Sequence, residues 1–411
     1  MNNNSSIRNI VIIWIGWAIM MIAFQHWVIM RVELRSPDHF LDPAQQRSPY
    51  LDNPFMNSHI SWDSEFYLSI ATVGYDDPAV RGITSNFEWG TAQESYCIPG
   101  TNSGCYSLNY AFFPLYPLLT RLLTYPLHFL NLNPIARSTL AAISLSLLGT
   151  LGAMLALYFM TRTSLGEDGG VRAAFYLLIF PSSFFLAQVY TEGLFLGLTF
   201  GSLAFLLSRK WAWCALLAAL AVWTRPGGAI LLLPMAMVWW IDKSWKDGWK
   251  IALLHGLAAL SPALSYGLWS LTPMAGKFHI VEDHYFNRGL LAIGPSALAW
   301  GRALTTLLSG DPPFKFFYGL EFTGVVLAVL TCIWLWRERP ELSSYGLAMI
   351  VFAVTSGIAQ SMIRYMLVVP VLFWVLARWG KNPVFDRLFS LLCILLLGLE
   401  IMLFSFDFWV G

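Results

Sequence analysis

Apolar residues in this chain come in runs of about 17 to 25, the length that crosses a bilayer as a helix, and short polar turns separate the runs. The first run extends from about Asn9 to Met30. It is too long for a signal-peptide core and lacks a small-residue cleavage site, so we expect a retained first span. Further spans are predicted near residues 135–161, 171–188, 190–208, 211–224, 226–241, 251–271, 317–336, 343–358, 362–379 and 388–408. The pattern predicts an all-α polytopic membrane protein with about eleven transmembrane helices.

Two long polar segments, 31–134 and 272–316, interrupt this pattern. Within the first, residues 112–130 contain Pro114 and Pro117, which suit a helix start and an interfacial helix better than a clean span. No repeat of fixed period is evident, so an inverted-repeat transporter gains no support. We expect one membrane domain, residues 1–411, with two large outer insertions.

Composition agrees with this layout, because 57% of the residues are hydrophobic and only 12% are charged. With the N-terminus inside, every predicted inner loop is basic, as the positive-inside rule requires. These loops carry Arg162, Arg172, Arg209, Lys210, Lys243, Lys246, Lys250, Arg337, Arg339, Arg378, Lys381 and Arg387. Treating 112–130 as a span would place the later basic loops outside. The net charge of +1, without a basic patch, argues against a nucleic-acid partner.

The five cysteines show no metal-ligand spacing. Cys214, Cys332 and Cys393 lie in apolar spans and are expected to be packing residues. Cys97 and Cys105 share one polar loop, where a disulfide in an oxidising compartment and two free thiols both remain open.

The stretch from Ser61 to Tyr75 places two carboxylates, Asp63 and Glu65, beside aromatic residues in the first outer segment. As a helix it has one apolar face, formed by Trp62, Phe66, Ile70 and Val73. We expect it to lie flat on the bilayer with both acids directed at the surface. A carboxylate fixed at such a boundary can act as a general base. Alternatively Asp63 caps the helix that begins after Trp62, and both roles can coexist.

Three further polar features are predicted on the same outer side. A tight turn between two spans contains Gln188, Tyr190 and Glu192. These polar groups either have a function, or they cap the turn and leave the acid solvated. Arg225 precedes Pro-Gly-Gly in what resembles a broken helix that could face an anion, although a snorkelling arginine is the alternative. Arg364 supplies a second guanidinium. Two arginines on one side favour a bound phosphate or pyrophosphate.

The second insertion contains four residues of metal-binding type, His279, Glu282, Asp283 and His284. Their spacing matches no metal motif, so a solvated helix is the better expectation. The chain has no phosphate-cradling Gly-rich loop, no G-x-S-x-G and no H-E-x-x-H. No cofactor is expected, and a divalent cation is left open.

Several motifs together resemble the GPI mannosyltransferase 2 family (the PIG-V type) and its prokaryotic relatives. They are Trp62-Asp63-x-x-x-Tyr67-x-x-Ile70-Ala71-x-x-Gly74-Tyr75, Phe112-Phe113-Pro114-Leu115-Tyr116-Pro117, Pro181-Ser-Ser-Phe-Phe with Tyr190-Thr-Glu192, and Thr224-Arg225-Pro226-Gly227. The resemblance spans most of the chain in order, and its first two motifs are the more specific.

The resemblance implies a GT-C glycosyltransferase whose first outer loop carries the catalytic carboxylate and whose donor is a polyprenyl-phosphate sugar, usually mannose. Asp63 would then be the base that deprotonates the acceptor hydroxyl, and a single displacement would invert the anomeric centre. The expected substrate-binding residues are Tyr67, Tyr116, Tyr190, Glu192, Arg225 and Arg364, with Glu65 in a supporting role. The acceptor, lipid-linked or another glycan, stays open.

Three alternatives remain: another GT-C enzyme that transfers a pentose, glucose or an oligosaccharide, a lipid or sugar transporter, and a scaffold subunit with no active site. The insertion with Cys97 and Cys105 matches no family pattern. The outer segment lacks an Asn-x-Ser/Thr sequon, which favours a bacterial plasma membrane over the endoplasmic reticulum. The active site is expected on the non-cytoplasmic side.

Overall fold

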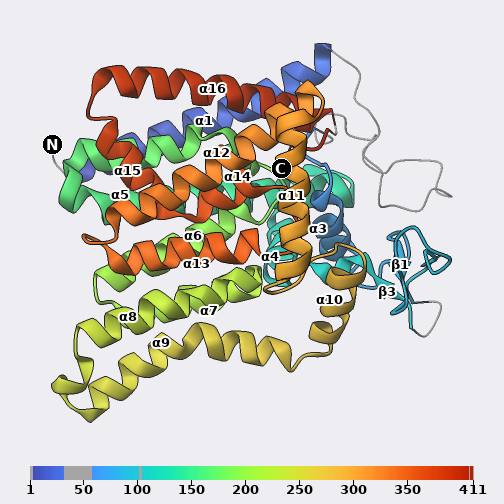
Figure 1. The fold of residues 1–411 in the computed structure, drawn as a ribbon, viewed down its shortest axis with the longest axis horizontal. Coiled ribbons are helices and arrows are strands. Elements are labelled where there is room, and N and C mark those ends of the chain that lie inside the picture. The colour runs from blue at the N-terminus through green and yellow to red at the C-terminus, as the bar shows by residue number, and fades with distance from the viewer. Residues whose placement is uncertain (1–2, 32–57, 101–103, 407, 411) are drawn as a thin grey trace.

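Helices make up most of the structure, a computed structural model that describes residues 3–31, 58–100, 104–406 and 408–410 (Figure 1). The α-helices are α1 (Asn3–Arg31), α3 (Asp63–Thr72), α4 (Leu115–Thr124), α5 (Pro134–Ile179), α6 (Glu192–Leu207), α7 (Trp211–Thr224), α8 (Leu232–Ile241), α9 (Trp249–Ser270), α10 (Pro273–His284), α11 (Ile293–Ser309), α12 (Pro312–Leu335), α13 (Pro340–Val354), α14 (Met362–Tyr365), α15 (Pro370–Trp379) and α16 (Pro383–Ser405). Short 3-10 helices occupy Leu108–Ala111, Tyr125–Leu130, Pro181–Ala187, Pro226–Leu231, Ser244–Asp247 and Met366–Val368.

Five helices in the described residues are long and apolar enough to cross a membrane: α1, α5, α9, α12 and α16. Two bent pairs also pass this test, Pro181–Ala187 with α6 at 98° and Met362–Val368 with α15 at 85°. The other apolar helices, α7, Pro226–Ile241 and α13, have 10–17 residues and are shorter than the roughly 20 that a straight span needs. The helical membrane architecture predicted from sequence is therefore present, while the count of eleven spans is not confirmed.

Helix α5 is a hairpin of two limbs that correspond to two predicted spans. Gly166 adopts φ +74°, a left-handed conformation that favours glycine, and the helix breaks there. Tyr158 on the first limb donates a hydrogen bond to Glu167 on the second. A Cβ at Gly170 would lie 2.7 Å from the Tyr158 ring, so the two limbs turn back on each other.

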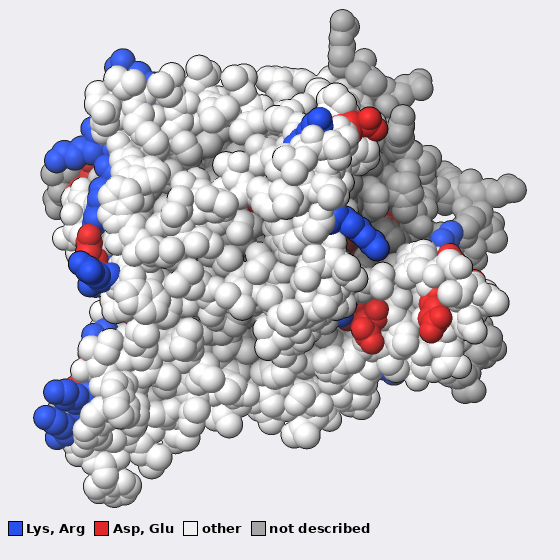
Figure 2. Space-filling view, viewed as in Figure 1, with Lys and Arg blue, Asp and Glu red and all other residues white. Residues whose placement is uncertain are grey.

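Charged side chains gather at the end of the molecule where the N-terminus lies, along the left edge of Figure 2. Arg209, after α6, pairs with Asp242 at the end of α8. Arg378, in the last turn of α15, pairs with Glu338 in the turn between α12 and α13. Helix α6 begins at Glu192 and ends next to Arg209, so Glu192 and these basic turns occupy opposite ends of the helix layer.

The end opposite the basic turns carries an outer subdomain with a three-stranded antiparallel sheet in the order β2-β1-β3 (Figure 1). Its strands are β1 (Gly82–Ile83), β2 (Tyr96–Cys97) and β3 (Tyr106–Ser107). Cys97 and Cys105 form a disulfide beside the sheet, one of the two states that the sequence left open. Helix α10 packs on this subdomain through Val281 and Tyr285, so it is not the solvated helix predicted from sequence.

Helix α4 has 10 residues, too few to span, as the two prolines predicted. It exposes Leu118 and Leu122, and the following 3-10 helix exposes Tyr125 and Phe129. These apolar side chains suit the headgroup boundary of a bilayer.

Glycines bring α5 and α6 into backbone contact. A Cβ at Gly193 would collide with the Ser146 carbonyl, and one at Gly149 would collide with the Gly193 carbonyl. A Cβ at Gly197 would collide with the Gly149 carbonyl in turn. Small residues that allow such an approach are typical of packing between membrane helices. Because Gly193 follows Glu192 directly, this contact also fixes the position of that carboxylate.

Gly193→Ala should force α6 away from α5 and lower the free energy of unfolding by about 1–3 kcal/mol, the usual cost of overpacking. Gly152→Ala is the matched control, because a Cβ there would meet only an ordinary contact, Gly197 Cα at 3.7 Å. Thermal unfolding in detergent compares the two variants. Equal midpoints for both would contradict the close contact.

Candidate active site

Asp63 is the first residue of α3 and lies at the rim of a charged cluster. Its carboxylate is 3.8 Å from the Arg364 guanidinium, and 25% of its side chain is exposed. The cap position belongs to Trp62, and no side chain caps this helix end. The carboxylate in the first turn is favoured by the helix dipole, but its nearest charged partner is an arginine from a distant part of the chain.

Helix α3 does not lie flat on a bilayer, and that prediction was wrong. Residues from Ser64 to Ala71 are buried, because the helix packs against α4 and α5 inside the protein. Glu65 is fully buried and follows Asp63 by two positions, about 200° around the helix. The two acids therefore point in different directions, and only Asp63 lies beside Arg364.

Polar groups that sequence reasoning missed fix the C-terminal end of α3. Arg121 on α4 donates from Nε to the Ala71 carbonyl at 2.6 Å, so a cation meets the negative end of the helix dipole. Asn109 donates to the Ser69 hydroxyl at 2.9 Å and to the Gly74 carbonyl at 3.2 Å. Residues Ile70 to Gly74 of the first motif thus end the helix that carries Asp63. The sequence signal for this contact was Arg121 itself, a charged residue in the otherwise apolar helix α4.

Glu192 is the first residue of α6 and the most buried member of the cluster, with 1% of its side chain exposed. Its Oε1 is 2.5 Å from Nη2 of Arg225 and 3.3 Å from Nε of Arg364. Within the described residues no donor bonds the other oxygen, Oε2. One buried carboxylate is therefore shared by two guanidinium groups and keeps one oxygen open.

Arg225 lies in the break between α7 and the 3-10 helix Pro226–Leu231. Its backbone is extended, with φ −155° and ψ 147°, and its Nε donates to the Thr191 hydroxyl at 2.5 Å. A Cβ at Gly228 would lie 2.5 Å from the Ala221 backbone, so this tight break requires a glycine there. The broken helix predicted from Arg-Pro-Gly-Gly is present.

Arg364 is held in α14 by a buried carboxylate that the sequence interpretation did not include. Glu321 on α12 accepts hydrogen bonds from the Ser361 amide at 2.8 Å and from the Ile363 amide at 2.7 Å. The guanidinium is 4.9 Å from the Phe185 ring and 5.5 Å from the Tyr190 ring. An acid inside an apolar span was the signal for Glu321, since such residues are rarely left without a function.

Three predicted tyrosines surround the cluster at different depths. Tyr67 lies 3.5 Å from the Thr191 hydroxyl, and burial raises its pKa, with the Asp63 charge adding to the shift and the Arg225 charge opposing it. Tyr190 donates to the Ser61 carbonyl at 2.9 Å and so holds the chain just before Asp63. Tyr116 on α4 is buried behind Tyr67, and its hydroxyl forms a hydrogen bond with the Ser146 hydroxyl of α5 at 2.9 Å.

Glu282 and Arg288, from the second outer insertion, reach the same region. Burial raises the pKa of Glu282 to about 7, while the Arg288 guanidinium opposes this shift and the Asp63 carboxylate adds to it. Arg288 donates from Nη1 to the Tyr365 hydroxyl at 3.0 Å. Over the described ranges, no three His, Cys, Asp or Glu side chains group as metal ligands. Sequence spacing did not reveal these two residues because the insertion folds back onto the membrane helices.

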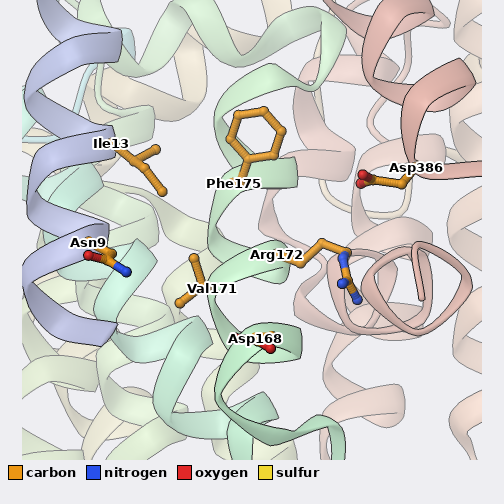
Figure 3. Close-up of a pocket in the computed structure, with 7 residues that line it drawn as sticks. All are labelled: Asn9, Ile13, Asp168, Val171, Arg172, Phe175 and Asp386. Carbon is orange, nitrogen blue, oxygen red and sulfur yellow. The ribbon is translucent and has the colours of Figure 1, made fainter. Parts of the chain in front are cut away.

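A cavity of about 320 Å³ lies elsewhere, between α1, the second limb of α5 and α16 (Figure 3). Two of its polar side chains already have partners within the protein. Asp386 accepts from the Tyr176 hydroxyl at 2.7 Å, and Arg172 donates to the Ala377 carbonyl at 3.2 Å. The cavity contains Asn9 near the N-terminus and none of the residues around Asp63, so the charged cluster is the better candidate for chemistry.

Glu192→Gln should remove the charge that Arg225 and Arg364 share and lower the free energy of unfolding by about 3–5 kcal/mol. Adding Arg225→Met removes one uncompensated cation, so the double variant should lose less than the sum of the two single losses. Thermal unfolding measures this coupling. Asp242→Asn breaks the more exposed pair with Arg209 and should cost less than about 1 kcal/mol. Additive losses would refute the shared ion pair.

Glu282→Gln should stabilise the protein only as the pH rises. The pKa of Glu282 is about 7 in the folded protein and ordinarily 4.5, so folding favours the protonated acid. The contribution of this protonated acid to the free energy of unfolding is complete below pH 4.5 and is lost as the pH rises through 7. Glutamine stays neutral throughout, so the variant should unfold at least roughly 2 °C higher at pH 8 and at an unchanged temperature at pH 4.5. Asp283→Asn, an exposed neighbour, should show no such pH dependence. A pH-independent effect of Glu282→Gln would count against the raised pKa.

Known proteins were compared with the chain in sequence and in structure. A family model described as Mannosyltransferase (PIG-V) matches residues 87–245, a range that begins after Asp63 and includes Glu192 and Arg225. No curated protein matches the chain.

Solved structures that align with most of the chain include an archaeal oligosaccharyltransferase and ArnT. The oligosaccharyltransferase of Archaeoglobus fulgidus in the apo form has 12% identity and a TM-score of 0.46, over 97% of this chain and 56% of that one. ArnT of Cupriavidus metallidurans in the apo state has 15% identity and a TM-score of 0.47, over 95% of this chain and 76% of that one. The chain thus spans little more than half the length of the archaeal enzyme, and likenesses of this size support no further conclusion. The family model covers less than half of the chain, and over residues 87–245 the sequence is similar to the PIG-V mannosyltransferases.

Proposed function

We propose that this protein transfers a sugar, expected to be mannose, from a polyprenyl-phosphate donor to a hydroxyl of a lipid-linked or glycan acceptor, with Asp63 as the general base. The position of Asp63 carries the proposal. Its carboxylate is one-quarter exposed, so an acceptor can reach it, and the buried Arg364 guanidinium lies 3.8 Å away. Transfer from a lipid phosphate to a hydroxyl uses a base for the acceptor proton and a cation for the leaving phosphate, and this cluster contains both kinds of group.

In the proposed reaction, Asp63 takes the proton of the acceptor hydroxyl as its oxygen attacks the anomeric carbon. The bond from that carbon to the phosphate oxygen breaks, and its electron pair leaves with the lipid phosphate. Arg364 and Arg225 lie where guanidinium groups can stabilise this developing negative charge. A single displacement of this kind inverts the anomeric centre.

The sugar itself would lie against Glu192. Within the described residues its buried Oε2 accepts no hydrogen bond, and a sugar hydroxyl that entered the site would supply the missing donor. Tyr67 offers a hydroxyl next to Thr191 on the same side. Tyr190 would hold the Asp63 segment, and Tyr116 and the buried Glu65 would support α3 from behind.

Backbone strain at the start of α3 also supports a functional role. Trp62 has φ +58°, a conformation that costs a non-glycine residue about 1–3 kcal/mol. The Trp409 ring packs against it with the ring centroids 4.8 Å apart. Strain of this kind clusters at active sites, and here it directly precedes the proposed base.

We place the site on the non-cytoplasmic side of a bacterial plasma membrane. The basic turns lie at the opposite end of the helix layer from Glu192, as expected for cytoplasmic loops. The Cys97–Cys105 disulfide lies in the outer subdomain, against which Phe66 of α3 packs, and it suits an oxidising compartment.

Asp63→Asn should reduce kcat for sugar transfer by about 10²- to 10⁴-fold, because the amide cannot accept the acceptor proton. Purified protein with labelled polyprenyl-phosphate mannose provides the assay, and donors carrying glucose or arabinose test the sugar. Donor affinity should change much less than kcat, since Asp63 acts on the acceptor.

Asp283→Asn is the matched control, an exposed acid of the second insertion that should leave turnover unchanged. Near-normal turnover by Asp63→Asn would rule out Asp63 as the base.

A further inference from the structure

The charges around Asp63 balance before any substrate binds. Two guanidinium groups, Arg225 and Arg364, face two carboxylates, Glu192 and Asp63, at 2.5 to 3.8 Å. Glu192 pairs with both arginines, so the positive charge of each guanidinium is already partly compensated. These four residues alone do not provide a surplus cation for an anionic ligand.

Arg288 supplies that surplus. It is half-buried in the segment between α10 and α11, and Nη1 donates to the Tyr365 hydroxyl at 3.0 Å. The same hydroxyl accepts from Arg364 at 3.4 Å, so Tyr365 joins Arg288 to the four-residue cluster. Among the described residues no carboxylate lies within 4.0 Å of the Arg288 guanidinium, although Glu282 and Asp63 face it from farther away.

Backbone contacts hold Arg288 in place. The Arg288 amide donates to the Glu282 carbonyl at 2.9 Å, and the next amide, Gly289, donates to Ser356 at the same distance. Gly357 adopts φ +107°, and a Cβ there would collide with the Asn287 carbonyl, so only glycine suits this close approach. The backbone at Arg288 is therefore attached to the turn that precedes α14 and Arg364, and the Tyr365 hydroxyl holds the guanidinium. A group fixed in this way loses little freedom when it binds a ligand.

We propose that Arg288 binds the phosphate group of the polyprenyl-phosphate donor and keeps it beside Arg364. This inference rests on the proposed function for the identity of the ligand. The bound donor is a phosphodiester with one negative charge, with which the Arg288 guanidinium can pair. When the bond to the anomeric carbon breaks, the phosphate gains a second negative charge, and a guanidinium stabilises that change through charge-assisted hydrogen bonds.

Polyprenyl phosphate without a sugar is the probe, and binding to the full-length protein in detergent is the measurement. Arg288→Met should weaken its binding by about 10- to 100-fold, the effect of one or two charge-assisted hydrogen bonds. Arg288→Lys keeps the charge but loses the planar fork, so it should weaken binding less and serves as the second variant if the methionine variant does not fold. Arg302→Met, an exposed arginine on α11, should bind like the unchanged protein.

Two further ligands separate the phosphate from the lipid tail. Polyprenol of the same chain length should bind all variants equally, and inorganic phosphate should compete with polyprenyl phosphate less well in Arg288→Met. In transfer assays the substitution should raise the KM for the donor more than it lowers kcat. If polyprenyl phosphate binds Arg288→Met or Arg288→Lys as tightly as the unchanged protein, the inference is wrong.

The inference and the proposed function fail in different ways. Arg288-dependent binding of polyprenyl phosphate by a protein that transfers no sugar would keep the inference and refute the transferase proposal. Sugar transfer with unchanged donor binding in Arg288→Met would support the transferase proposal and refute the inference about Arg288.

Discussion

One buried carboxylate, Glu192, holds the centre of this structure together. It accepts from Arg225 at 2.5 Å and faces Arg364 at 3.3 Å while almost no part of it is exposed. Burying a charge is costly unless partners surround it, and here each charge is the partner of another. The helix dipole at the start of α6 adds to the stabilisation of the carboxylate. Moving any one of these groups would leave an uncompensated charge in the protein interior.

The position of Glu192 depends in turn on backbone packing. Gly193, the next residue, lies against the Ser146 carbonyl of α5, and Gly149 on the same helix meets the Gly193 carbonyl. Ser146 also donates to the Tyr190 carbonyl at 2.9 Å and bonds the Tyr116 hydroxyl. The two motifs that contain Tyr116 and Glu192 are thus joined through one serine. The two motifs therefore occur together for a structural reason, which does not require Tyr116 or Tyr190 to contact a substrate.

Sequence alone predicted that the four charged residues lie on one side of the molecule, but not which of them contact one another. The positive-inside rule assigned Asp63, Glu192, Arg225 and Arg364 to one side, and the structure brings these four together. Periodicity failed for α3, because an apolar face on a short helix is the same whether it meets lipid or protein. It also could not identify Glu321, Arg121 and Arg288, whose partners lie far away in the chain. The number of spans stayed open because several apolar helices are short or bent.

The cluster forms where helices are interrupted, and this has a physical reason. Asp63 and Glu192 begin helices, Arg225 lies in a break, and Arg364 lies in the four-residue helix α14. Helix interruptions leave backbone amides and carbonyls that apolar surroundings cannot satisfy, so polar side chains or ligands must meet them. Glu321 does this at α14 and Arg121 at α3. Because such places already require polar groups, a membrane protein can add reactive charges there at a smaller cost than in the middle of a continuous helix.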